Sequence, residues 1–167
     1  MSYGGGSRFS IGQDDGNKGE VYGVDGAKQV KGRKRHLIVD SLGQVMKVVV
    51  TEANGSERIG ALYGLMAWTE QYPDVVERLS TVLADAGYRG GAFRRGVCSL
   101  VGAEVEMLTR PTRAFAVIAK RWVVERTFAW WNLYRRLSKD YELLPEVSEA
   151  AIYAVTIHLT LRRLAPA

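Results

Sequence analysis

The sequence is poor in the residues that build several common kinds of site. Cys98 is the only cysteine, which excludes an intramolecular disulfide and a metal site with several cysteine ligands. His36 and His158 are the only histidines, so the chain has no histidine-rich metal site. No GxGxxG or Walker sequence is present to hold a nucleotide. No apolar run approaches the roughly 20 residues of a membrane span, and the first residues lack the apolar segment of a secretory signal. We therefore expect a soluble, cytoplasmic protein with no membrane partner.

The composition points to a folded domain with an acidic partner. The 167 residues are 47% hydrophobic and 25% charged, which suits one globular domain with a core of its own. The net charge is +5 and the isoelectric point is near 9.4. This balance favours nucleic acid over a membrane surface as the partner. The alternative is a basic protein that binds no polyanion.

The pattern of elements predicts a mixed α/β domain. Eight of the 18 glycines lie within residues 1–27, so we expect a poorly ordered arm over residues 1–22 and one domain over residues 23–167. The expected strands are 36–40, 45–51, 81–85 and 105–108, and the expected helices are 56–71, 92–101, 115–138 and 148–164. In the first helix we expect the apolar stripe Ile59, Leu62, Leu65, Met66 and Thr69 to face the core, and in the last helix Ile152, Val155 and Leu159.

The segment from Arg110 to Lys139 has one acid among many cations. Glu125 stands there with eight basic residues: Arg110, Arg113, Lys120, Arg121, Arg126, Arg135, Arg136 and Lys139. Guanidinium groups pair with phosphate and aromatic rings stack on bases, so this segment suits a polyanion. A carboxylate in that setting is a candidate ligand for a divalent metal. Helical spacing places Arg121, Asn132 and Arg136 on the same helix face as Glu125. The alternative to a metal site there is an ion pair between Arg121 and Glu125.

Other candidate residues also have a structural alternative. Asp85 ends an apolar strand and precedes a glycine turn, where open α/β sheets place their ligand sites, although it could simply form the turn. The basic run Lys31, Arg33, Lys34 and Arg35 is a candidate for phosphate contact or a solvated stretch of charge. Core packing, rather than a stacking platform, is the favoured role of the apolar side chains on the aromatic helix, namely Trp122, Val124, Phe128 and Trp131.

Three segments resemble the DDE-type insertion-sequence transposases, in the bacterial branch related to insertion sequences four and five. They are Gly23-Val-Asp-Gly-Ala-Lys-Gln-Val-Lys-Gly-Arg-Lys-Arg-His-Leu-Ile-Val-Asp40, Leu83-Ala-Asp-Ala-Gly-Tyr-Arg-Gly90, and Arg121-Trp-Val-Val-Glu-Arg-Thr-Phe-Ala-Trp130 with Arg135-Arg-Leu-Ser-Lys-Asp-Tyr-Glu142. Their order and spacing match the family over about residues 20–165.

The resemblance implies an RNase H-like fold in which three acids hold two Mg²⁺ or Mn²⁺ ions. Asp85 falls on the second acid of the family, Glu125 on the third, and Arg121 on the arginine before that third acid. The resemblance further implies double-stranded DNA as partner, both insertion-sequence ends and target, assembly into a homo-oligomer when active, and a place with the bacterial nucleoid. Two metals would stabilise the attacking and leaving oxygens of phosphodiester hydrolysis and strand transfer.

The first acid of the family has no clear equivalent. Asp14 and Asp15 lie in the right region but in no convincing strand, while Asp25 and Asp40 match no catalytic position, and Asp40 is placed as a turn former. We expect the first strand of the fold to be lacking or degenerate. The expectation is therefore a truncated or frame-disrupted, catalytically incomplete transposase, or a downstream half that needs an upstream partner. The alternatives are a non-enzymatic DNA-binding remnant and another RNase H-like nuclease, such as a resolvase.

Overall fold

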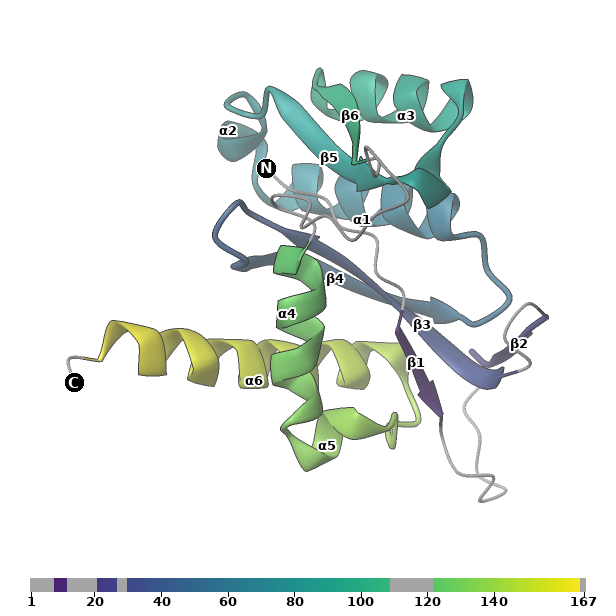
Figure 1. Cartoon of the computed structure of the whole chain (residues 1–167), viewed down its shortest axis with the longest axis vertical. Coiled ribbons are helices and arrows are strands. Elements are labelled where there is room, and N and C mark those ends of the chain that lie inside the picture. Colours follow the sequence, from purple (N-terminus) through teal and green to yellow (C-terminus); the bar gives the residue numbers. More distant parts are fainter. Residues whose placement is uncertain (1–7, 12–20, 27–29, 109–121, 166–167) are drawn as a thin grey trace, which may run out of the picture.

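A computed structural model describes residues 8–11, 21–26, 30–108 and 122–165 of the chain. Along the described residues a series of strands comes first, helices and strands then alternate, and a series of helices comes last. Helices lie on both sides of the larger sheet (Figure 1). The prediction of a mixed α/β class is confirmed. Among the described residues, none of the helices combines the length and the apolar character needed to cross a membrane.

A four-stranded antiparallel sheet is built around the long strand β3 (Val30–Val39). One neighbour is β4 (Val45–Glu52), and the other is β1 (Arg8–Ile11), which pairs with residues 32–35 of β3. β2 (Gly23–Asp25) pairs with the first three residues of β3. The sequence predicts no strand in the segment that contains β1, and the division of the chain at residue 22 stays a prediction.

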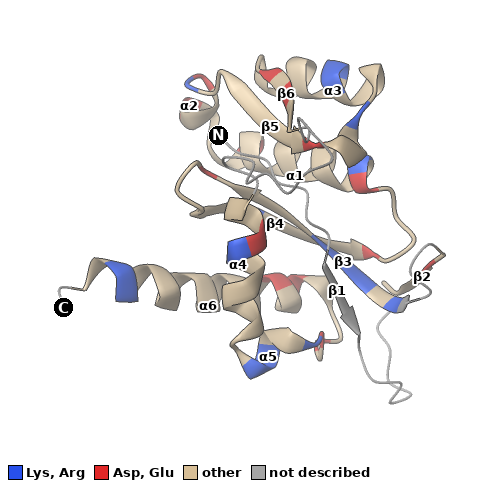
Figure 2. Ribbon diagram, viewed as in Figure 1, with Lys and Arg blue, Asp and Glu red and all other residues tan. Residues whose placement is uncertain are grey.

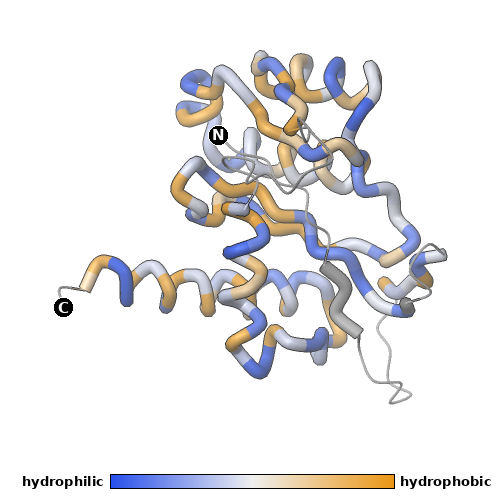
Figure 3. The backbone as a smooth tube through the Cα atoms, in the orientation of Figure 1, coloured by the Kyte–Doolittle hydropathy of each residue, from blue (hydrophilic) through white to orange (hydrophobic). Residues whose placement is uncertain are grey.

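Side chains of β3 alternate between two cores, one on each face of this sheet, as the two-residue period of a strand requires. Leu37 and Val39 pack against the helices after residue 121, and Ile38 packs on the opposite face. Figure 3 shows that β4 and β5 are largely hydrophobic, whereas the first half of β3 is hydrophilic. β3 therefore carries its basic run into the middle of a sheet.

A second sheet contains two parallel strands, β5 (Thr81–Asp85) and β6 (Glu104–Leu108). The connection between them is a short 3₁₀ turn, η1 (Ala86–Tyr88), and helix α3 (Gly91–Val101). Parallel strands need such a crossover. The three buried residues at the centre of β5 are apolar, and Asp85 at its end is only partly buried. The sequence-based bounds of this strand–helix–strand unit agree with the structure to within one residue.

Helices enclose the larger sheet. α1 (Glu57–Gln71) covers one face, α3 packs against α1, and the short α2 (Pro73–Val76) follows α1. α4 (Trp122–Asn132), α5 (Arg135–Ser138) and α6 (Pro145–Leu164) form the core on the other face (Figure 1). The predicted inward stripe of the last helix is confirmed, since Ile152 is fully buried and its two partners on the stripe pack against the same core.

The predicted aromatic helix over 115–138 is wrong at its C-terminal end. α4 ends at Asn132, where Leu133 and Tyr134 donate their N–H groups to carbonyls three residues back. Tyr134 is extended, and α5 begins after it. Tyr134 packs against the α4–α6 core and meets His158 edge to face, so tertiary contact accompanies the break. Residues 109–121, including the predicted start of the helix, lie outside the described residues.

The predicted stripe of α1 is wrong in part. Leu65 is buried and Leu62 packs against the core, but small residues make up much of the buried face. α1 buries Gly60, Ala61, Gly64, Leu65 and Trp68, whereas Ile59 is 69% exposed. The His36 ring fills the space opposite Gly60, where a Cβ atom would overlap it. Burial lowers the pKa of His36 to about 4, so this ring is neutral near pH 7. A pattern search weighted toward large apolar residues misses a face made of glycine and alanine.

We predict that Gly60→Ala destabilises the fold, whereas Gly64→Ala does not. Alanine raises helix propensity by up to about 1 kcal/mol at both sites. At Gly60 the methyl group would strike the His36 ring, which Thr51 holds at 2.8 Å, and overpacking costs roughly 1–3 kcal/mol. At Gly64 the nearest side-chain atom lies at an ordinary 3.5 Å. Urea unfolding of both variants measures the difference, and equal free energies of unfolding would contradict the packing described.

Candidate active site and nucleic-acid interface

Asp85 lies at the C-terminal end of β5, as the sequence predicts. Its Oδ1 accepts the N–H of Gly87 at 2.6 Å and so caps the 3₁₀ turn that follows. The carboxylate is partly exposed, and its second oxygen can accept further bonds or bind a cation. The turn-forming role that sequence reasoning kept as an alternative is therefore present, and it also fixes the orientation of the carboxylate.

A second carboxylate approaches the same turn. A Cβ atom at Gly87 would lie 3.3 Å from Oδ1 of Asp85 and 4.0 Å from Oε2 of Glu57, the first residue of α1. Arg58 binds the same turn by donating from Nε to the Gly87 carbonyl at 3.2 Å. Sequence reasoning missed Glu57, since its only local signal is that of an acid in the first turn of a helix.

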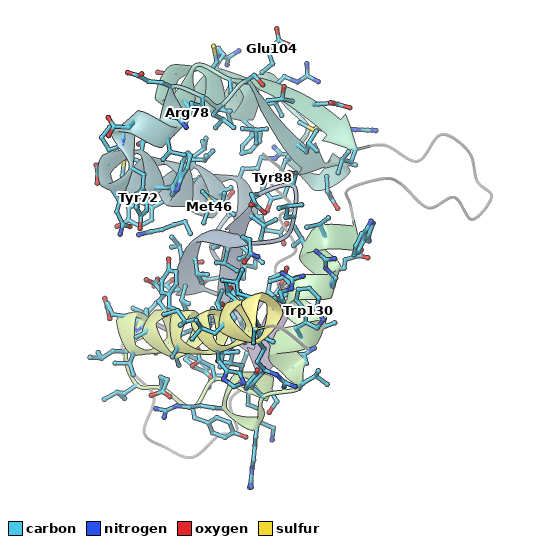
Figure 4. The ribbon with its side chains drawn as sticks, turned by 90° about the vertical axis from the view of Figure 1, so that its left-hand side faces the viewer. Met46, Tyr72, Arg78, Tyr88, Glu104 and Trp130 are labelled. Carbon is cyan, nitrogen blue, oxygen red and sulfur yellow. The ribbon has the colours of Figure 1, made fainter. Side chains whose placement is uncertain are left out.

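Glu125 lies in the first turn of α4 and is exposed. Figures 1 and 4 agree in placing the start of α4 near the C-terminal end of β5, which carries Asp85. Arg121 lies outside the described residues, so the predicted ion pair with Glu125 is not described. Arg136 belongs to α5, and the predicted continuous face from Glu125 to Arg136 is therefore wrong.

The remaining acids considered from the sequence have other positions. Asp40 accepts the N–H groups of Leu42 and Gln44 at 2.9 and 2.8 Å, which confirms that it forms the turn between β3 and β4. Asp25 is buried, and its Oδ2 lies 3.9 Å from Nζ of Lys34. Asp14 and Asp15 fall outside the described residues. Within the described part of the chain, no three histidine, cysteine or acidic side chains gather closely enough to hold a metal ion.

The basic run on β3 is divided by burial. Lys31 is exposed, but Arg33, Lys34 and Arg35 are 1%, 7% and 5% exposed. Lys34 donates to the carbonyl of Gly55, and Arg35 donates to that of Leu137. Burial is also the main cause that lowers the pKa of Arg35. In this structure these three side chains are buried and bonded within the protein rather than presented to solvent.

Arg33 binds the segment that follows α5. Its Nη1 lies 3.4 Å from Oδ2 of Asp140, a carboxylate that also accepts the hydroxyl of Ser148. The guanidinium donates to the carbonyls of Glu142 and Leu143 as well. The structure therefore explains Arg33 as a buried clamp between β3 and the chain leading into α6.

The predicted cations on the helices remain accessible to different degrees. Arg135 is exposed; Arg136 is 68% exposed and bonds Glu142 through Nε at 2.8 Å, and that hydrogen bond raises its pKa. Lys139 is partly buried. Arg126 lies between aromatic rings and donates to the Leu42 carbonyl at 2.7 Å. Figure 2 shows basic residues on α4, on α5 and near the C-terminal end of α6, on one side of the larger sheet.

Comparison with known proteins identifies a family whose model matches most of the chain. Residues 6–160 match the family model described as the transposase DDE domain. A protein assigned as a transposase for insertion sequence element IS402 of Burkholderia cepacia is 29% identical over 127 residues. That match covers 71% of this chain and 58% of the relative, so the chain spans little more than half of the protein it resembles. No solved structure matches the chain.

We predict that Arg33→Leu strongly destabilises the fold and Lys31→Leu does not. Removing Arg33 leaves Asp140 as a buried charge without its guanidinium, a change that typically costs about 3–5 kcal/mol. Lys31 is exposed two residues away on the same strand and serves as the matched control. Chemical unfolding followed by circular dichroism measures both. A stable Arg33→Leu protein with weakened DNA binding would instead make Arg33 a phosphate contact.

Proposed function

Because the chain belongs to the transposase DDE domain family, we propose that it acts in DNA transposition through metal-dependent phosphodiester chemistry at Asp85 and Glu125. The observation that carries the proposal is the position of these two acids. Asp85 ends β5 and Glu125 stands in the first turn of α4, and both lie inside the matched residues 6–160. These are the acids that the resemblance assigns to the second and third acids of the family motifs.

The two carboxylates suit the metal in chemical kind. Mg²⁺ and Mn²⁺ bind preferentially to carboxylate and water oxygens, and Asp85 is held at the end of a strand with one oxygen fixed by Gly87. Asp85 and Glu125 would hold the cation, and Glu57 is the described acid that shares the Gly87 turn. When bound, the metal supplies Lewis-acid stabilisation of the phosphodiester oxygens and a more acidic water. The protein's own contribution is to fix Asp85 against the turn and to present Glu125, exposed in the first turn of α4.

We also propose an RNase H-like arrangement with a degenerate first strand. β1 has the sequence Arg-Phe-Ser-Ile and contains no acid, and it pairs with only four residues of β3. The first acid of the family is thus unassigned on this chain. With two of three carboxylates, affinity for metal and neutralisation of charge should both be low, so we expect weak nicking and little or no strand transfer. An upstream half of the protein and assembly into a homo-oligomer belong to the same proposal.

Double-stranded DNA is the proposed partner, contacted through Lys31, Arg135, Arg136 and Lys139. Arg135, Arg136 and Lys139 follow α4 closely in the chain, and the first two are exposed. Buried Arg33, Lys34 and Arg35 are left out of this surface. A rival proposal is a DNA-binding remnant without catalysis, which the missing first acid favours. Another RNase H-like nuclease is a weaker rival, because the family match favours a transposase.

We predict that Asp85→Asn and Glu125→Gln each abolish nicking of supercoiled DNA in Mn²⁺ or Mg²⁺ and keep DNA binding. Each substitution removes a negative charge at the proposed metal site and leaves the cations in place. Glu106→Gln, an exposed acid on β6, is the control. Nicking that persists in either variant would remove that residue from the metal site. Binding without any nicking by the unaltered chain would favour the remnant, and cleavage restricted to branched DNA would favour the nuclease.

We further predict that Arg135→Ala with Arg136→Ala shallows the salt dependence of DNA binding. Each lost phosphate contact lowers the slope of log affinity against log salt by roughly 0.9. The matched control is Arg94→Ala with Arg95→Ala, an adjacent exposed pair on α3. Filter binding over a range of salt concentrations gives the slopes. An equal slope for the two double variants would show that the α5 pair makes no phosphate contact.

A further inference from the structure

Arginine and tryptophan side chains alternate along one face of α4. Trp122, Arg126 and Trp130 are spaced four residues apart and therefore lie on one face of the helix. The Cζ atom of Arg126 lies 4.2 Å from the ring centroid of Trp122 and 4.6 Å from that of Trp130. Arg163 of α6 places its Cζ atom 4.3 Å from the Trp130 centroid. Figure 4 shows Trp130 on α4 beside α6. We call these four side chains the stacked ladder.

The ladder holds two positive charges against a single ring. Arg126 and Arg163 both stack on Trp130, and they repel one another. Burial first, and then the charge of Arg163, lower the pKa of the Arg126 guanidinium. A guanidinium held over a ring keeps its N–H groups at its edge, where arginine pairs with phosphate. Arg126 already uses part of this edge on the Leu42 carbonyl, whereas Arg163 is exposed. An anion beside the ladder would relieve the repulsion.

Packing alone accounts for the middle of the ladder but not for its ends. Arg126 donates to the carbonyl of Leu42 and so ties α4 to the β3–β4 turn, a structural role. At one end, however, Trp122 is 45% exposed, and at the other Arg163 is exposed. The tryptophans with a purely structural place, Trp68 and Trp131, are fully buried. An exposed indole and an exposed guanidinium that are already held in position lose little entropy when they bind a ligand.

We propose that the stacked ladder binds a DNA strand beside Glu125, with phosphate on Arg163 and an unpaired base stacked on Trp122. This inference rests on the proposed function, because it assumes that DNA is the partner. Glu125 lies in the same first helical turn as Trp122, so a strand on the ladder passes next to the proposed metal site. Stacking on an aromatic ring accepts any base, and the arginine supplies attraction without reading sequence. The ladder therefore positions a strand end rather than selecting a sequence.

The test is tryptophan fluorescence and affinity with a single-stranded oligonucleotide at fixed salt. Trp122 and Trp130 report on binding, since the two buried tryptophans are shielded. We expect Trp122→Leu and Arg163→Gln each to weaken binding by at least about fivefold, the lower end of the effect of losing one stacked base. Trp122→Leu should also remove most of the quenching. Arg162→Gln, the neighbouring exposed arginine of α6, removes the same charge and should change binding by less than about twofold.

The outcomes separate this inference from the proposed function. The inference is overturned if the unaltered chain binds DNA and the Trp122→Leu variant binds it with the same affinity, while Arg163→Gln has no more effect than Arg162→Gln. The ladder would then be structural. If the unaltered chain binds no DNA, the proposed function fails first and the inference fails with it. Both substituted ladder residues are exposed ends, and thermal unfolding of the variants confirms that a loss of binding is not a loss of folding.

Discussion

The structure depends on strand β3 and on the partners that its buried polar side chains find. β3 is paired on both edges at Arg33, Lys34 and Arg35, and it sends alternate side chains into two cores. Burying a charge is costly unless the charge is paired and hydrogen-bonded. Arg33 is satisfied by Asp140 and by carbonyls of the segment before α6. This clamp fixes the chain after α5 against the sheet and so orients the helices on that face.

The same constraint divides the positive charge of the chain into two groups. The buried cations on β3 serve the fold, whereas those on α4, α5 and the end of α6 lie on one side of the larger sheet (Figure 2). The two candidate metal ligands lie where rigid elements end or begin, Asp85 at the end of β5 and Glu125 in the first turn of α4. An acid fixed by a turn, beside a helix rich in arginine and tryptophan, suits phosphodiester chemistry on a bound DNA strand.

Much of the fold could be predicted from local patterns, and the site only in part. β5, α3 and β6 follow from short apolar runs between glycine turns, and so does the position of Asp85 at the end of β5. Its role as a ligand stays a prediction from the rule that strand ends hold ligand sites. The burial of Arg33 could not be found locally, because its partner Asp140 is 107 residues away in the chain. The approach of Glu57 to the Gly87 turn depends on where the start of α1 lies relative to the turn after β5. The end of α4 at Asn132 likewise goes with the packing of Tyr134.

The most direct test of a shared metal site at Asp85 and Glu125 is Mn²⁺ binding followed by electron paramagnetic resonance. Two ligands of one ion act as a unit, so their substitutions should not be additive. The account predicts that Asp85→Asn, Glu125→Gln and the double variant lose Mn²⁺ binding to the same extent, with folding unchanged. Mn²⁺ binding that survives in both single variants, or losses that simply add in the double variant, would contradict the assignment of these two residues to one site.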